Sequence, residues 1–167
     1  MTIHTEHPFA DPHPDPARRF RGRLGGAVSL WTSGSAPDRS GLTVSSLMIA
    51  AGDPARVLGL VDPDSDLAES VQETGRCVVA LLEWTHRDLA EAFAGQLPAP
   101  GGPFTLGEWD QLDHGPRLRT ATTYAVGELE SAQDAGWSTL LVVRLVDVVV
   151  GDESAPLQHR RGRYVRP

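Results

Sequence analysis

Three hydroxyl side chains lie close together in the segment GLTVSSLMIA, residues 41–50, where Thr43, Ser45 and Ser46 follow a glycine and precede a mostly apolar run. In an extended strand Thr43 and Ser45 fall on one face and Ser46 on the other, so both faces carry a polar group. Such hydroxyls hydrogen-bond a polar ligand, or they bond locally to the backbone of an edge strand. Both interpretations stay open at this point.

Two absent residue types narrow the chemistry further. The chain has no lysine and no asparagine, so all 15 basic residues are arginines. This excludes a Schiff-base lysine and the lysine of a phosphate-binding loop. A bound phosphate would have to be held by hydroxyls, backbone N–H groups and arginine, in charge-assisted bonds of roughly 1.5–3 kcal/mol each. We also find no dinucleotide-binding glycine motif, hydrolase elbow or zinc-binding motif.

Length and charge limit the class of protein. A chain of 167 residues predicts about one domain. Its net charge of −7 disfavours a nucleic-acid or anionic-membrane surface. The single cysteine, Cys77, cannot form an internal disulfide, and no secretory signal is apparent, so we expect a cytoplasmic protein. The longest apolar stretch, residues 140–150, is too short to span a membrane.

The predicted organisation is a flexible N-terminal arm, residues 1–16, followed by a domain over residues 17–167. The arm is rich in His, Pro and Asp, and its histidines either bind a metal or form a solvated tail. A short helix is plausible at 17–24, and capping patterns ahead of glycines predict two more within 66–75 and 85–95. Alternating or apolar runs predict six strands, at 27–32, 42–50, 56–61, 76–82, 120–129 and 139–150.

The last of these strands is apolar on both faces apart from Arg144 and Asp147. A barrel strand that faces solvent would carry polar residues on its outer side. We therefore expect one face in the barrel and the other against a second subunit, since symmetric dimers are the commonest way to cover such a surface. A helix or segment of the same chain lying over the outer face is the alternative.

Five segments occur in an order and at distances that carry a resemblance: GGAVSLWTSG, GLTVSSLMIAAGDPARVLGLV, SDLAESVQETGRCVVALL, HRDLAEAFAG and PLQHRRGRYVRP. Together they resemble the flavin reductase family with the FMN-binding split barrel, over residues 18–166. The resemblance implies a mainly β fold, a six-stranded antiparallel Greek-key split barrel with short peripheral helices. It also implies a homodimer that holds a flavin, usually FMN and sometimes FAD, near the subunit interface.

The resemblance also implies candidate flavin contacts. The strand after Gly41 would lay its backbone against the flavin ring, because glycine permits close approach. Hydroxyls of the SS segment would turn toward the polar edge of the ring and the phosphate chain. The candidate cofactor-binding residues from the two strands are Thr32, Ser33, Gly41, Leu42, Thr43, Val44, Ser45 and Ser46.

Two further positions could hold phosphate. Ser65 precedes a predicted helix, whose N-terminus favours an anion, but Asp66 would repel one unless it points away, and Ser65 as a simple helix cap is the alternative. Arg163 in the C-terminal segment either contacts phosphate or belongs to a solvated basic terminus. For the neighbouring Arg160, Arg161 and Arg166 we favour the solvated terminus.

The implied reaction is hydride transfer from NADH or NADPH to flavin, which needs no protein acid or base. The reduced flavin would pass to a partner monooxygenase. Two positions depart from the family pattern: Trp137 stands where relatives often have a histidine near the nicotinamide, and Ala80 replaces a common asparagine. Trp137 either stacks on nicotinamide or fills the interface. His114, with Trp109 in a loop lid, completes the predicted nicotinamide side.

Two other functions remain open. The chain could bind flavin as a carrier, sensor or partner subunit without efficient reduction, or it could be a dimeric barrel that binds no flavin. No catalytic residue and no metal site is predicted.

Overall fold

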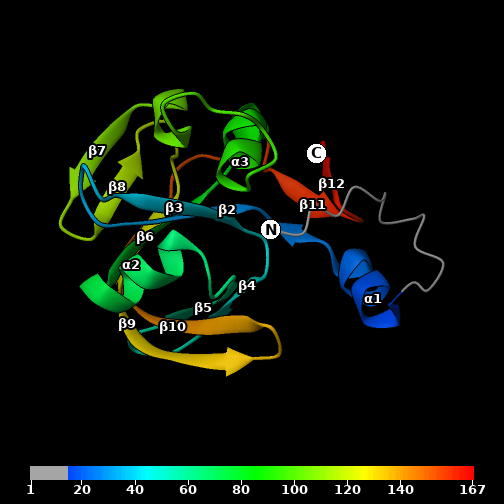
Figure 1. Cartoon of the computed structure of the whole chain (residues 1–167), viewed down its shortest axis with the longest axis horizontal. Coiled ribbons are helices and arrows are strands. Elements are labelled where there is room, and N and C mark those ends of the chain that lie inside the picture. Colours follow the sequence, from blue (N-terminus) through cyan, green and yellow to red (C-terminus); the bar gives the residue numbers. More distant parts are fainter. Residues whose placement is uncertain (1–14) are drawn as a thin grey trace.

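The structure is a computed structural model that describes residues 15–167, and its main element is a curled antiparallel sheet of seven strands (Figure 1). The spatial order is β3, β2, β6, β9, β10, β5, β4. The bounds are β2 Ser29–Ser33, β3 Ser40–Val44, β4 Leu47–Ala50, β5 Arg56–Val61, β6 Arg76–Leu81, β9 Tyr124–Ala135 and β10 Ser138–Val149. The predicted mainly β, antiparallel split-barrel class is confirmed.

The sheet has seven strands where six were predicted because the expected strand at 42–50 is divided. It breaks at Ser45 and Ser46 into β3 and β4, which form the two opposite edges of the sheet. Consecutive segments can occupy opposite edges only if the sheet curls until those edges approach each other. Ser45 and Ser46 therefore form a corner at the seam of the half-barrel, which we call the serine corner.

The core inside the curl is built around Trp31, whose side chain is fully buried. A Cβ added at Gly59 would lie 2.6 Å from Cζ2 of Trp31, so only glycine lets β5 pass this close to the indole. Cys77 is buried in the same cluster, and burial raises the pKa of its thiol to about 12. This cysteine is a small core residue and stays protonated.

Helices α2 Asp66–Thr74 and α3 Arg87–Phe93 pack against the strands at residues 29–44, and 3₁₀ turns lie at Trp84–His86 (η1) and Pro103–Leu106 (η2). The N-cap of α2 is Ser65, one residue before the predicted start of the capping pattern, because its Oγ accepts from the Ala68 N–H. Helix α3 begins after η1 rather than at Thr85.

A small hairpin packs against β2 and β6, and η2 packs against α3. The hairpin consists of β7 Trp109–Leu112 and β8 Gly115–Leu118. The rings of Phe93, Phe104 and Trp109 meet edge to face with centroids 4.8–5.8 Å apart. This aromatic cluster ties η2 and the hairpin to α3.

The two ends of the described chain meet in a separate three-stranded sheet of β1 Gly26–Ala27, β11 Gln158–Arg160 and β12 Arg163–Val165. Helix α1, Pro16–Leu24, stands apart from the body in Figure 1 and buries none of its residues. It begins at Pro16 with Asp15 as N-cap, so the predicted arm does not reach residue 16. Residues 1–14, with the histidines of the arm, lie outside the described residues.

Candidate functional site

The serine corner is the most accessible part of the predicted flavin segment. Ser45 is exposed and Ser46 is half-buried. Neither hydroxyl forms a hydrogen bond within the part of the chain that the structure describes, whereas the Ser46 carbonyl accepts from the Leu60 N–H at 2.9 Å. The backbone of the corner is thus fixed by β5 while two hydroxyls remain available to a ligand.

Thr43 is different, because its Oγ1 donates to the Ala90 carbonyl at 2.6 Å. The Thr43 hydroxyl is therefore used within the fold, by the backbone of helix α3 rather than by the local edge-strand backbone of the predicted alternative. Val44 is buried in the core and Leu42 packs against the same cluster, so only their backbone reaches the open edge of β3. At Gly41 the group in close approach is the Phe93 ring, 2.6 Å from where a Cβ would lie.

Thr32 and Ser33 lie inside the fold rather than beside a groove. Both are buried. Thr32 donates its hydroxyl proton to the Pro116 carbonyl, and Ser33 donates to the Arg76 carbonyl at 2.8 Å. Their hydroxyls are thus used within the fold, and a flavin contact at these two positions stays a prediction that would have to involve their backbone.

Ser65 acts as a helix cap. Its hydroxyl donates to the Asp62 carbonyl at 2.6 Å and accepts from the Ala68 N–H at 3.2 Å. It lines a hollow of about 580 Å³, the acidic hollow, formed by Pro63, Asp64, Ser65, Glu69, Gln72 and Glu73. Asp66 also lies in the first turn of α2. The carboxylates around this helix N-terminus oppose the binding of a phosphate that the helix dipole alone would favour.

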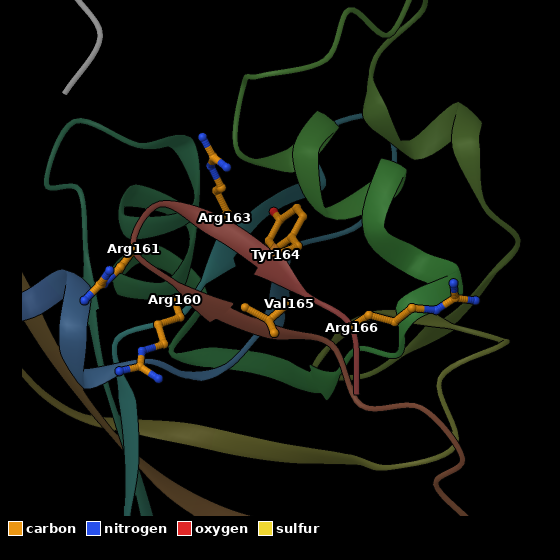
Figure 2. Close-up of a pocket in the computed structure, with 6 residues that line it drawn as sticks. All are labelled: Arg160, Arg161, Arg163, Tyr164, Val165 and Arg166. Atoms are coloured by element: carbon orange, nitrogen blue, oxygen red, sulfur yellow. The ribbon is translucent and has the colours of Figure 1, made fainter. Parts of the chain in front are cut away.

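Arg163 lines a second hollow, of about 600 Å³, at the C-terminal hairpin (Figure 2). We call it the arginine hollow, and its lining residues are Arg160, Arg161, Arg163, Tyr164, Val165 and Arg166. Arg166 also lies over the Trp84 ring, 5.6 Å from its centroid. All four arginines are exposed, as a solvated terminus would have them, so contact with phosphate stays a prediction.

The serine corner lies next to both the C-terminal hairpin, which carries the arginine hollow, and the end of β5. A Cβ at Gly26 would be 3.6 Å from the Ser45 carbonyl oxygen, and Gly26 pairs with His159 of β11. On the other side, Ser46 bonds Leu60, two residues before Asp62 and the loop that forms the acidic hollow. The two hydroxyls therefore lie between a basic and an acidic region.

Glu83 holds the segment that leads into the C-terminal hairpin, and His86 supports Glu83; sequence reasoning missed both residues. Oε1 of Glu83 accepts from the Ser154 N–H at 2.9 Å, just before the C-terminal strands, and this bond contributes most to lowering the pKa of Glu83. His86 Nδ1 accepts from the Glu83 N–H, and its Nε2 lies 3.0 Å from Thr120 Oγ1. Burial lowers the pKa of His86, so its neutral form fits this arrangement.

The outer face of β4, β5 and β10 is apolar. Leu140 pairs with Leu60, and Val142 pairs with Leu58, which in turn pairs with Met48. Met48 is 67% exposed, and Val146 and Val148 further along β10 are also exposed. Their β10 neighbours Leu141 and Val143 point into the core. The strand is thus apolar on both faces, as predicted, and no described segment covers this outer face.

Trp137 and His114, the predicted nicotinamide side, lie in different parts of the protomer. Trp137 is 96% exposed at the tip of the β9–β10 hairpin, near the end of β5, since Thr139 pairs with Val61. His114 lies in the β7–β8 turn beside Ser33, at the opposite end of β2 and β3 from the serine corner. Within one protomer the structure does not bring the two residues together.

Two features are absent within residues 15–167: a metal-binding cluster and a membrane-spanning helix. No group of three His, Cys, Asp or Glu side chains there could hold a metal ion. No helix in that range is long and apolar enough to cross a membrane.

A sequence model of the flavin reductase like domain matches residues 21–167. The chain is 28% identical over 151 residues to the FMN reductase (NADH) RutF of Agrobacterium fabrum, covering 89% of this chain and 86% of that protein. It is 31% identical over 143 residues to RutF of Ancylobacter novellus, covering 85% of this chain and 78% of that protein.

Solved structures share the fold. BorF, the flavin reductase component of a bacterial two-component tryptophan halogenase, superposes with a TM-score of 0.79 at 23% identity, over 90% of this chain and 95% of BorF. The styrene monooxygenase flavin reductase of Pseudomonas putida superposes with a TM-score of 0.80 at 19% identity, over 92% of this chain and 97% of that reductase.

Proposed function

This chain belongs to the family of flavin reductase like domains, and from that premise we propose that it is an oxidoreductase that reduces a bound flavin with a reduced nicotinamide nucleotide. The observation that carries the proposal is the serine corner, where two hydroxyls without partners in the described chain lie at the seam of the half-barrel. The RutF relatives, named FMN reductases (NADH), favour FMN over FAD and NADH over NADPH.

The residues present fit a flavin at this corner. Ser45 and Ser46 offer hydroxyls, and the edge strands β3 and β4 offer backbone N–H and C=O groups not used by the sheet. Hydride acceptance is the chemistry that a bound flavin supplies, so the chain's task is to bind, orient and exclude water. In this proposal the flavin contacts no side chain of residues 41–44. Gly41, Leu42, Thr43 and Val44 contribute backbone groups or support the fold around the site.

We propose that a second copy of the chain covers the outer face of β4, β5 and β10. Edge strands and apolar sheet faces of this kind are normally covered, and a closed two-fold dimer covers both copies at once. The serine corner lies at the rim of this face, because Ser46 bonds Leu60. A dimer would therefore enclose the site and exclude water from it. Trp137 and His114 stay candidates for the nicotinamide side of such a dimer.

A carrier or sensor that binds flavin without reducing it efficiently is the second candidate. It is favoured by Ala80, which is buried and offers no polar side-chain atom on β6. A partner monooxygenase that receives reduced flavin is proposed by analogy with BorF, named as the reductase component of a two-component halogenase, and with the reductase named for styrene monooxygenase. A cytoplasmic location also stays a prediction.

The purified chain tests the proposal directly. We expect flavin absorption in the protein or saturable binding of added FMN, together with rapid NADH oxidation that depends on FMN. Flavin binding without NADH oxidation would support the carrier. Absence of any flavin binding would contradict both candidates. Sedimentation of the same preparation as a monomer would contradict the dimer.

A further inference from the structure

The arginines of this chain are distributed unevenly. Eight of the 15 lie on helix α1 and the C-terminal hairpin, which we call together the basic end: Arg18, Arg19, Arg21, Arg23, Arg160, Arg161, Arg163 and Arg166. The helix and hairpin are joined by the Arg161 N–H, which donates to the Gly22 carbonyl at 2.8 Å. In the described chain every ion pair involves an arginine outside this end. Within residues 15–167 the basic end therefore forms no ion pair.

The hairpin also opposes its own charges. Arg160 and Arg163 pair directly across β11 and β12, where like charges destabilise a ladder. Figure 2 shows their side chains turned to opposite sides of the hairpin, and each lines the arginine hollow. Between them Arg161 has φ +52°, the one positive φ of a non-glycine residue in the described chain. The two guanidinium groups thus avoid each other (Figure 2), and Arg161 with Gly162, at φ +52° and +74°, forms the two-residue turn of the hairpin, which requires positive φ at both positions. The turn explains the backbone conformation, so only the clustering of the arginines is left to indicate a ligand.

The hairpin lies beside the serine corner. Gly26, one strand away, pairs with His159 and comes within contact distance of the Ser45 carbonyl. A Cβ at Gly25 would be 3.7 Å from Cγ of Arg160. Arginines and two hydroxyls are the groups that a lysine-free chain has available for phosphate.

We propose that the arginine hollow, with Arg160 and Arg163 as its principal charges, binds a phosphate group of the nucleotide used at the serine corner. This inference rests on the proposed function and adds the place of the phosphate. The phosphate belongs to the flavin or to the nicotinamide dinucleotide, and in both cases it lies at the C-terminal hairpin rather than at the start of α2. The acidic hollow is excluded by its carboxylates, and Ser65 already uses its hydroxyl within the helix cap.

The test replaces both arginines, Arg160→Gln with Arg163→Gln, in the full chain. Dissociation constants are measured by titration for FMN, riboflavin and NADH at low salt. A matched control, Arg56→Gln with Arg119→Gln, makes the same change in net charge at a half-buried and an exposed arginine that form surface ion pairs outside the basic end. Surface pairs of this kind contribute little to stability, so both variants should fold.

We expect the hairpin variant to bind FMN or NADH at least tenfold more weakly, since one charge-assisted contact accounts for such a factor. Riboflavin, which has no phosphate, should bind unchanged, and the control should match the wild type. Weaker FMN assigns the hollow to the flavin phosphate, and weaker NADH alone assigns it to the dinucleotide.

Three results would overturn the inference. The first is unchanged affinity for both FMN and NADH, and the second is an equal loss for riboflavin and FMN. The third is an equal loss in the control variant. In each case wild-type flavin binding still supports the proposed function. A wild type that binds none of the three ligands contradicts the proposed function itself.

Discussion

The acidic hollow and the arginine hollow are nearly equal in size, about 580 and 600 Å³, yet opposite in charge. The first opens at a helix N-terminus, the backbone feature usually associated with anions. The second opens on a hairpin, which has no comparable dipole. The side chains reverse the preference for an anion that the backbone alone would give. Near a helix start, the carboxylates of Asp64, Asp66 and Glu69 must be counted before an anion is assigned.

The largest expected effect comes from reversing the charge of the arginine hollow. Arg160→Glu with Arg163→Glu should weaken FMN binding about a hundredfold or more, because two attractive contacts become repulsive. The dissociation constant from flavin fluorescence measures this. The far-UV spectrum and melting temperature should match the wild type, since both side chains are exposed. If the charge reversal left FMN affinity unchanged, the arginine hollow would bind phosphate no better than the acidic hollow.

The serine corner should show the next largest effect. Ser45→Ala with Ser46→Ala should weaken flavin binding by more than tenfold through the lost hydrogen bonds. Because these hydroxyls bond no described residue, the fold should be unaffected. Riboflavin and FMN should weaken by a similar factor if the hydroxyls contact the ring, which separates this role from that of the arginines. Thr43→Val is a control that instead lowers stability, because Thr43 bonds Ala90.

Neutralising the acidic hollow should have a smaller effect of opposite sign. Asp64→Asn with Glu69→Gln removes two like charges near any bound anion, and we expect FMN affinity at low salt to rise two- to threefold. Stability should fall by roughly 0.3–1 kcal/mol, because Glu69 lies in the first turn of α2 and favours the helix dipole. A loss of FMN affinity would instead indicate that the acidic hollow contacts the ligand.

The smallest effect concerns pH. Burial lowers the pKa of His86, and burial together with Arg21 lowers that of His159, so the folded chain favours both neutral. As pH falls below about 6.5, the ordinary histidine pKa, the unfolded chain binds protons that the folded chain resists, and stability is lost. The protection factors of the C-terminal hairpin, which are amide exchange rates corrected for the intrinsic chemical rate at each pH, should therefore be lower below pH 6 than at pH 7.5.

Helix α2, which contains no histidine, serves as the internal reference for that measurement. Its exchange should respond to pH only through the intrinsic chemical rate. His86→Gln should remove part of the extra acid sensitivity of the hairpin, because glutamine does not titrate in this range. An equal fall in the protection factors of α2 and the hairpin would contradict a localised effect.

The strands were largely predictable from the sequence, since β5 was predicted at its observed bounds and β10 within one residue. The division at Ser45 and Ser46 was not, because a strand that turns a corner keeps the same alternation of side chains. Helix α2 was predicted one residue off at its cap, since Ser65 and Asp66 are both good capping residues. The short strands of the C-terminal hairpin lack an apolar period and gave no signal.

The candidate site was predicted in part. Resemblance pointed to the hydroxyl segment, but only coordinates separate Ser45 and Ser46 from Thr43, whose hydroxyl meets a helix distant in sequence. From the sequence, Thr32 and Ser33 could not be distinguished from Ser45 and Ser46 as candidate flavin contacts, because residue type at a strand end does not indicate burial. The role of Glu83 and His86 depends on contacts with residues 120 and 154 and so could not be seen locally.

The uneven distribution of arginine gives this acidic protein a large electric dipole. All but three of its 22 acidic residues lie between residues 28 and 157, and the basic end contains no acidic residue, although Asp15 caps its helix. An anionic nucleotide approaching from solution is repelled by the monopole but turned by the dipole toward the end where the serine corner lies. Its encounter rate should therefore fall with ionic strength, even though protein and ligand carry charges of the same sign.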